Sequence, residues 1–75
     1  MNTLLNELDE EIKKAQAKHA PMVNSHEAYA VILEEVDEFW DEVRKQTQDR
    51  ERSAMRKELL HIAAMAMRAI HDLNL

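Results

Sequence analysis

The chain has 75 residues, no cysteine, no glycine and a formal net charge of −5. This length allows one small domain, residues 1–75, and the absence of cysteine excludes a disulfide framework and a thiolate metal site. The negative charge argues against nonspecific nucleic-acid binding. Since the sequence also lacks a membrane-length apolar run and a basic N-terminal signal region, we expect a cytoplasmic protein that binds neither nucleic acid nor membrane.

Residue composition and apolar spacing predict an all-α fold of three helices. The dominant residue types, Ala, Leu, Glu, Lys, Met and Arg, are strong helix formers. The first predicted helix runs from about Thr3 to Lys18 and ends before Pro21, whose preceding residue disfavours helix. Residues 1–19 therefore form an N-terminal helical segment, with one apolar stripe made by Leu4, Leu5, Leu8, Ile12 and Ala15.

The second predicted helix starts after Asn24, which has the spacing of a capping box with Glu27. It extends to about Gln46 and would carry one broad apolar face. We expect this face, including its three aromatic residues, to lie in the core. Its members are Tyr29, Ile32, Leu33, Val36, Phe39, Trp40 and Val43.

The third predicted helix follows a polar turn at residues 46–50, starts near Glu51 or Ser53 and ends near Leu73. Between Leu59 and Met67 it is apolar on nearly every side, which is typical of a helix buried on several sides. Three helices of this size cannot cover such a helix, so we expect a homodimer or tetramer with a four-helix-bundle core.

The second and third helices, within residues 25–73, are expected to form an antiparallel hairpin. In such a hairpin the numbers of facing residues have a nearly constant sum, so Glu38 lies level with Glu58 and Glu35 lies level with His61. Each helix presents its two residues on one face, because they are three positions apart. The spacing thus predicts that three carboxylates and one imidazole meet as a metal site.

Glu58 stands inside the apolar stripe of its own helix. The neighbours on this stripe are Met55, Ile62, Met65 and Ala69. A carboxylate in such surroundings must be paired, protonated or metal-bound, because an isolated buried charge is costly. An ion pair with a lysine or arginine of another helix is the alternative to metal ligation.

Two motifs, Glu34-Glu35-Val36-Asp37-Glu38 and Glu58-Leu59-Leu60-His61, resemble the EExxE…ExxD signature of the MazG-like all-α nucleoside triphosphate pyrophosphohydrolases. The resemblance implies hydrolysis of a (d)NTP to the nucleoside monophosphate and pyrophosphate with bound Mg²⁺. It implies that Glu35, Glu38, Glu58 and His61 are the metal ligands, His61 standing at the aspartate position. Glu34 would be an accessory acid, so that the acids implied in catalysis are Glu34, Glu35, Glu38 and Glu58.

His61 departs from the family signature, and this departure opens alternatives. Mg²⁺ prefers oxygen ligands, so an imidazole favours Mn²⁺ or another transition metal. A Glu-x-x-His pair with a glutamate from a second helix, doubled in a homodimer, is also the ligand set of di-iron carboxylate bundles. A third alternative is a catalytically inactive helical interaction module. For the outer phosphates of a triphosphate, the sequence offers Arg44, Lys45, Arg52, Arg56 and Lys57.

Overall fold

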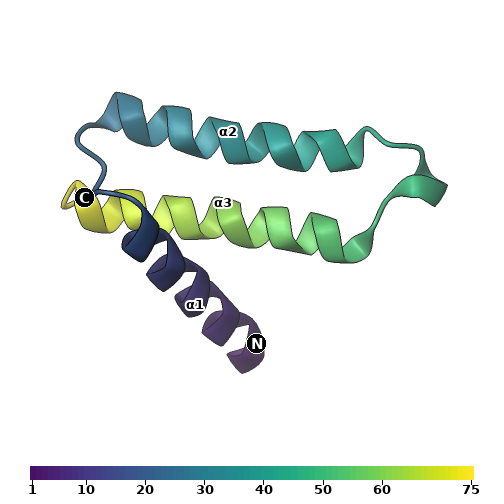
Figure 1. Ribbon diagram of the computed structural model, residues 1–75, viewed down its shortest axis with the longest axis horizontal. Coiled ribbons are helices and arrows are strands. Elements are labelled where there is room, and N and C mark those ends of the chain that lie inside the picture. Colours follow the sequence, from purple (N-terminus) through teal and green to yellow (C-terminus); the bar gives the residue numbers. More distant parts are fainter.

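The computed structural model describes residues 1–75 and confirms an all-α fold of three helices without strands. In Figure 1, α2 and α3 run side by side in opposite directions, and α1 crosses α3 obliquely. No helix is long and apolar enough to cross a bilayer. The elements are α1 (Asn2–Lys18), α2 (Ser25–Val43), the short 3-10 helix η1 (Thr47–Asp49) and α3 (Arg52–Asp72).

The ends of α2 are fixed by side chains that bind free backbone groups. Asn24 accepts a hydrogen bond from the Glu27 N–H at 2.9 Å, and Glu27 in turn accepts one from the Val23 N–H at 3.1 Å. The capping box is therefore present, with its return bond one residue earlier than the usual pattern. At the other end Arg50 donates to the Val43 carbonyl at 2.8 Å, so α2 ends three residues before the predicted limit at Gln46.

The core of the molecule lies along α3, because α1 and α2 each pack against α3 rather than against each other. Ala64 and Ala69 of α3 and Ala28 of α2 are nearly inaccessible, and their small side chains let the helices approach closely. This agrees with the expectation that α3 is covered on more than one side. The five residues of the buried cluster are Met22, Ala28, Ala64, Met65 and Ala69.

Arg68 and Asp72 fasten the α1–α2 linker to the C-terminal end of α3. Asp72 accepts a hydrogen bond from the Met22 N–H at 2.9 Å, and Arg68 Nη2 donates to the Ala20 carbonyl at 3.2 Å. The two side chains are almost fully buried and lie 3.8 Å apart. These contacts fix where α1 ends and α2 begins, and so they set how both helices sit on α3.

The expected core face of α2 is split in the structure, which corrects part of the sequence prediction. Tyr29 and Trp40 are 61% and 57% exposed, and Leu33 and Val36 are also exposed. Ile32, Phe39 and Val43 are half-buried. Compared with the prediction, α2 is rotated about its own axis. The small Ala28 and the carboxylate of Glu35 face α3, so the stripe of larger apolar side chains faces outward.

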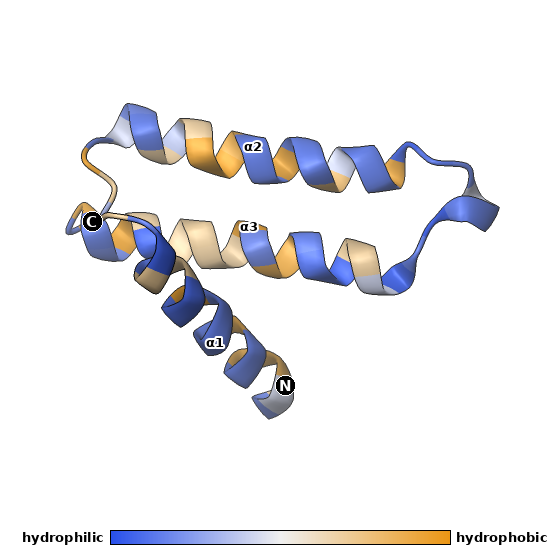
Figure 2. Cartoon of the chain, in the orientation of Figure 1, coloured by the Kyte–Doolittle hydropathy of each residue, from blue (hydrophilic) through white to orange (hydrophobic).

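The N-terminal half of α1 is only partly packed. Leu8, Ile12 and Ala15 contact the core, as the predicted stripe requires, whereas Leu4 and Leu5 stay exposed beside an open apolar groove along α3. Figure 2 shows hydrophobic and hydrophilic residues alternating along each helix. Large apolar side chains on all three helices remain exposed in a single chain.

Candidate metal centre

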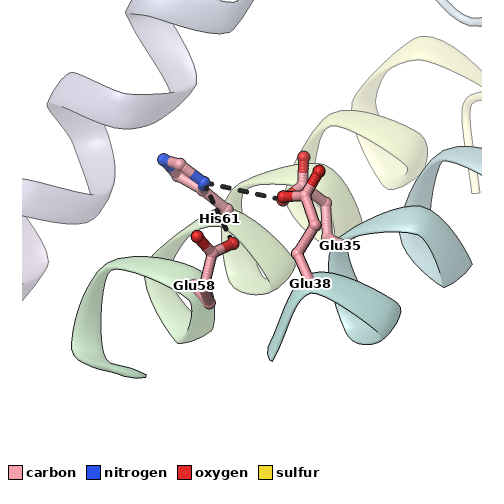
Figure 3. A group of neighbouring side chains, drawn as sticks. All are labelled: Glu35, Glu38, Glu58 and His61. Atoms are coloured by element: carbon pink, nitrogen blue, oxygen red, sulfur yellow. Dashed lines mark ion pairs between the residues drawn. The ribbon is translucent and has the colours of Figure 1, made fainter. Parts of the chain in front are cut away.

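The hairpin brings Glu35 and Glu38 of α2 next to Glu58 and His61 of α3, as Figure 3 shows. One ligand atom from each of the four side chains lies within 4.8 Å of all the others. The four residues predicted as metal ligands therefore meet in one place. Glu38 is the exposed member, and the other three are half-buried.

His61 Nδ1 is the point on which two carboxylates converge. It lies 3.5 Å from Glu35 Oε2 and 3.7 Å from Glu58 Oε2. Donor atoms about 2.1 Å from one shared ion stand roughly 3.0–3.4 Å apart at octahedral or tetrahedral angles. Small side-chain movements would therefore bring these atoms to the spacing that a divalent ion requires.

The same two oxygens are buried and lack any hydrogen-bond partner. Neither Glu35 Oε2 nor Glu58 Oε2 forms a hydrogen bond, and the nitrogen that both approach is His61 Nδ1. An ionised carboxylate can only accept hydrogen bonds, so an ionised Glu38 cannot donate one to either oxygen. Glu38 can hydrogen-bond to Glu35 or Glu58 only when one of the carboxyl groups carries a proton. Because an unsatisfied buried charge is costly, this donor set fits a cation placed between the two oxygens.

The electrostatics of the cluster also show strain between its acids. Burial raises the pKa of Glu35 above its usual value, and the adjacent charge of Glu38 raises it further. Burial also raises the pKa of Glu58, and the neighbouring carboxyl group of Glu38 raises it further. No lysine or arginine forms an ion pair with Glu58, and the nitrogen nearest to its buried oxygen is His61 Nδ1 at 3.7 Å, so the alternative of a structural Lys or Arg pair does not hold.

A cleft of about 400 Å³ opens at His61 and Glu35, between α1 and α2. Glu34, the predicted accessory acid, is exposed on its wall and is not part of the four-residue cluster. Arg68 also lines the cleft, seven residues further along α3, or about 10 Å at 1.5 Å per residue. Beyond the four-residue cluster, the lining of the cleft holds three acids, Glu11, Glu27 and Glu34, and three cations, which are Lys14, Lys18 and Arg68.

None of the five basic residues proposed from sequence for the outer phosphates lines this cleft, but Arg56 and Lys57 line a second hollow that shares Glu11 with it. Three of them are bound by acids on the surface: Arg44 by Asp41, Lys45 by Glu42 and Arg56 by Glu7. Sequence reasoning missed Lys14, Lys18, Arg68 and also Glu11, which contacts His61. Arg68 could have been found from the sequence, because it stands four positions before Asp72 inside an apolar run. No sequence pattern distinguishes Glu11, Lys14 and Lys18 from the other charged residues of α1.

Comparisons with models of known families, with curated proteins and with solved structures found no match to this chain. The MazG-like resemblance therefore rests on the two short motifs quoted above. The structure adds that the two motifs meet in space, because Glu35 of the first and Glu58 of the second both approach Nδ1 of His61.

Proposed function

We propose that the protein binds a divalent metal ion at Glu35, Glu38, Glu58 and His61 and uses it to hydrolyse a nucleoside triphosphate to the monophosphate and pyrophosphate. One observation carries this proposal: Glu35 Oε2 and Glu58 Oε2 are buried, unpartnered and directed at the same imidazole nitrogen. A bound metal would polarise the reacting phosphate and lower the pKa of a water. Since one ligand is an imidazole, Mn²⁺ suits the site better than Mg²⁺.

The cleft beside the cluster supports a phosphorylated substrate. Lys14, Lys18 and Arg68 can neutralise phosphate oxygens that extend from the metal end toward the linker. Lys18 is the freest of the three, because Lys14 lies 3.5 Å from Glu11 and Arg68 contacts Asp72. For the residue that accepts the proton of an attacking water, we propose Glu34, which is exposed on the cleft wall.

We also propose that two copies associate through the apolar face opposite the cleft, here called the back face: Tyr29, Leu33, Val36 and Trp40 of α2 with Leu59 and Ile70 of α3. The chain exposes 5704 Å², about 900 Å² more than the roughly 4,800 Å² expected for a compact protein of 8.8 kDa. A standard interface buries about 800 Å² per partner. The excess area therefore matches what one stable dimer contact would cover.

This dimer geometry favours the hydrolase over the di-iron alternative. At about 100° per residue, Trp40 points about 160° away from Glu38, and Leu59 points about 160° away from His61. The metal ligands and the back face thus lie on opposite sides of the hairpin. Two copies joined through the back face keep their clusters apart, whereas a di-iron centre requires two Glu-x-x-His pairs in one core.

A direct test incubates the protein with each of the common dNTPs and NTPs, with Mn²⁺ or Mg²⁺, and measures pyrophosphate release. We expect turnover with Mn²⁺, loss of turnover in Glu58→Gln, and an increased KM in Lys18→Ala with a smaller effect on kcat. Asp37→Asn is the matched control, because Asp37 is an exposed acid of the same motif that lies outside the cluster. Absence of pyrophosphate with every nucleotide and either metal, from protein with intact helical circular dichroism, would refute the hydrolase proposal.

A further inference from the structure

A carboxylate from α1 completes the surroundings of His61. Glu11 Oε2 lies 3.4 Å from His61 Nε2, on the opposite edge of the ring from Glu35 and Glu58. The other oxygen of Glu11 lies 3.5 Å from Lys14 Nζ, so the carboxylate is held between the lysine and the imidazole. Both residues of the Glu11–His61 contact are about three-quarters buried, which shields it from solvent.

The two ring nitrogens of His61 therefore have different neighbours. A neutral imidazole offers one N–H donor and one lone pair, and the partner of one nitrogen decides the role of the other. Glu11 can only accept, so it favours the tautomer that carries the proton on Nε2. Glu35 and Glu58 also only accept, so without a metal they favour a proton on Nδ1. A metal ion between their oxygens would take the place of that proton, and the Nε2–H tautomer that Glu11 favours then leaves the Nδ1 lone pair for the ion.

We propose that Glu11 is a positioning residue of the metal centre: it accepts a hydrogen bond from His61 Nε2–H and so presents Nδ1 to the metal. The inference rests on the proposed metal binding at the Glu35, Glu38, Glu58 and His61 cluster. A carboxylate behind a ligating histidine fixes the ring orientation and raises its basicity as a ligand. The resembled signature has an aspartate, a charged ligand, at the position of His61. Glu11 thereby strengthens the neutral imidazole that stands there instead.

The contact also ties α1 to the metal centre. α1 packs on α3 alone, and its N-terminal half is partly exposed, so its attachment depends on few contacts. Because Glu11 favours the metal-ready state of His61 only while α1 is docked, metal binding and α1 docking stabilise each other. The metal centre is in this sense built by all three helices.

The test titrates Zn²⁺ into wild type, Glu11→Gln and Glu11→Ala, with Glu10→Ala as the matched control. Glu10 is an exposed acid on the same helix, so its removal changes the net charge equally without touching His61. We expect Glu11→Ala to weaken Zn²⁺ binding by about 10–100-fold. Glu11→Gln should lose less, since its amide oxygen still accepts the hydrogen bond, and Glu10→Ala should bind like wild type.

Two further readouts separate positioning from a merely structural role. In long-range ¹H–¹⁵N spectra of the Zn²⁺-loaded protein, His61 should carry its proton on Nε2 in wild type and lose this uniform state in Glu11→Ala. In a His61→Asp background, Glu11→Ala should no longer weaken metal binding, because no imidazole is left to orient. Equal weakening in both backgrounds, or unchanged affinity and tautomer in Glu11→Ala, would overturn the inference. A wild type that binds no Zn²⁺ or Mn²⁺ would instead refute the metal site itself.

Discussion

Glu35 on α2 and Glu58 on α3 direct buried, unpartnered oxygens at the same nitrogen of His61, at 3.5 and 3.7 Å. The two glutamates are 23 positions apart in the chain and meet only because the hairpin is antiparallel and in the predicted register. Their burial is unfavourable for the metal-free protein, since it raises the pKa of both groups. A bound cation would offset this unfavourable burial of charge.

The metal-free protein should become more stable as the pH is lowered from about 7 toward 4.5. Glu35 and Glu58 have folded-state pKa values above their usual 4.5, so the folded state binds their protons more tightly than the unfolded state. The stabilisation that these two protons give the folded state is fully present below pH 4.5. It is lost as the pH rises through the raised pKa values of the folded state. Urea unfolding across this range should show the trend, and Glu35→Gln/Glu58→Gln should remove it.

Asp72 limits this gain in stability at lower pH. The Met22 N–H and then His71 hold the pKa of Asp72 below its usual 3.8. Its contribution is present above pH 3.8 and is lost as the pH falls through the lowered folded-state pKa. The stability maximum of the metal-free protein should therefore lie on the acidic side of neutrality, and a maximum at or above neutral pH would contradict this assignment.

Removing Arg68 should destabilise the fold. The side chains of Arg68 and Asp72 are 4% and 5% exposed, so Arg68→Ala leaves a buried carboxylate without its cation and frees the Ala20 carbonyl. Loss of one partner of a buried pair is strongly destabilising, and we expect the Tm to fall by about 10 °C or more. Lys18→Ala, which removes an exposed cation, should leave the Tm within about 2 °C of wild type.

The back face should mediate self-association. We expect sedimentation velocity at micromolar concentration to give a dimer for wild type and a monomer for Trp40→Glu/Ile70→Glu, because charges would be buried in an apolar contact. Asp37→Asn should behave like wild type. A well-folded wild-type monomer would show that the exposed apolar area serves no contact between copies.

Replacing His61 by aspartate should change metal preference. His61→Asp replaces an imidazole by a charged oxygen ligand, so Mg²⁺ affinity should increase while affinity for Zn²⁺ falls. Calorimetric titration with both ions gives the ratio directly. An unchanged Mg²⁺ to Zn²⁺ ratio would mean that His61 is not a ligand.

The sequence was sufficient for the hairpin and its register, because both depend on local signals. The polar turn at residues 46–50 and the i, i+3 pairs predicted which residues face each other across α2 and α3. Asn24 with Glu27 likewise marked the start of α2. These features do not depend on how a third element packs.

The sequence did not predict which face of α2 is buried or which α1 residue reaches the site, because both depend on tertiary packing. Tyr29 and Trp40 were expected in the core but are exposed, since α2 presents Ala28 and Glu35 to α3. Glu11 looked like one more surface acid of an amphipathic helix, and its contact with His61 follows only from the crossing of α1 over α3. The linker contacts of Arg68 and Asp72, which hold the chain between α1 and α2 on α3, involve residues more than 50 positions from Glu11.

The most direct test of the metal centre is an isothermal titration of metal-free protein with Mn²⁺, comparing wild type, Glu58→Gln and Asp37→Asn. Glu58→Gln removes one of the two unpartnered buried charges, and because burial already disfavours that charge, the variant should stay folded. We expect one Mn²⁺ per chain in wild type and Asp37→Asn. In Glu58→Gln, which removes a direct ligand, the affinity should fall by more than the roughly 10–100-fold that loss of an outer-shell partner costs. Identical titration curves for the three proteins would contradict a metal centre at this cluster.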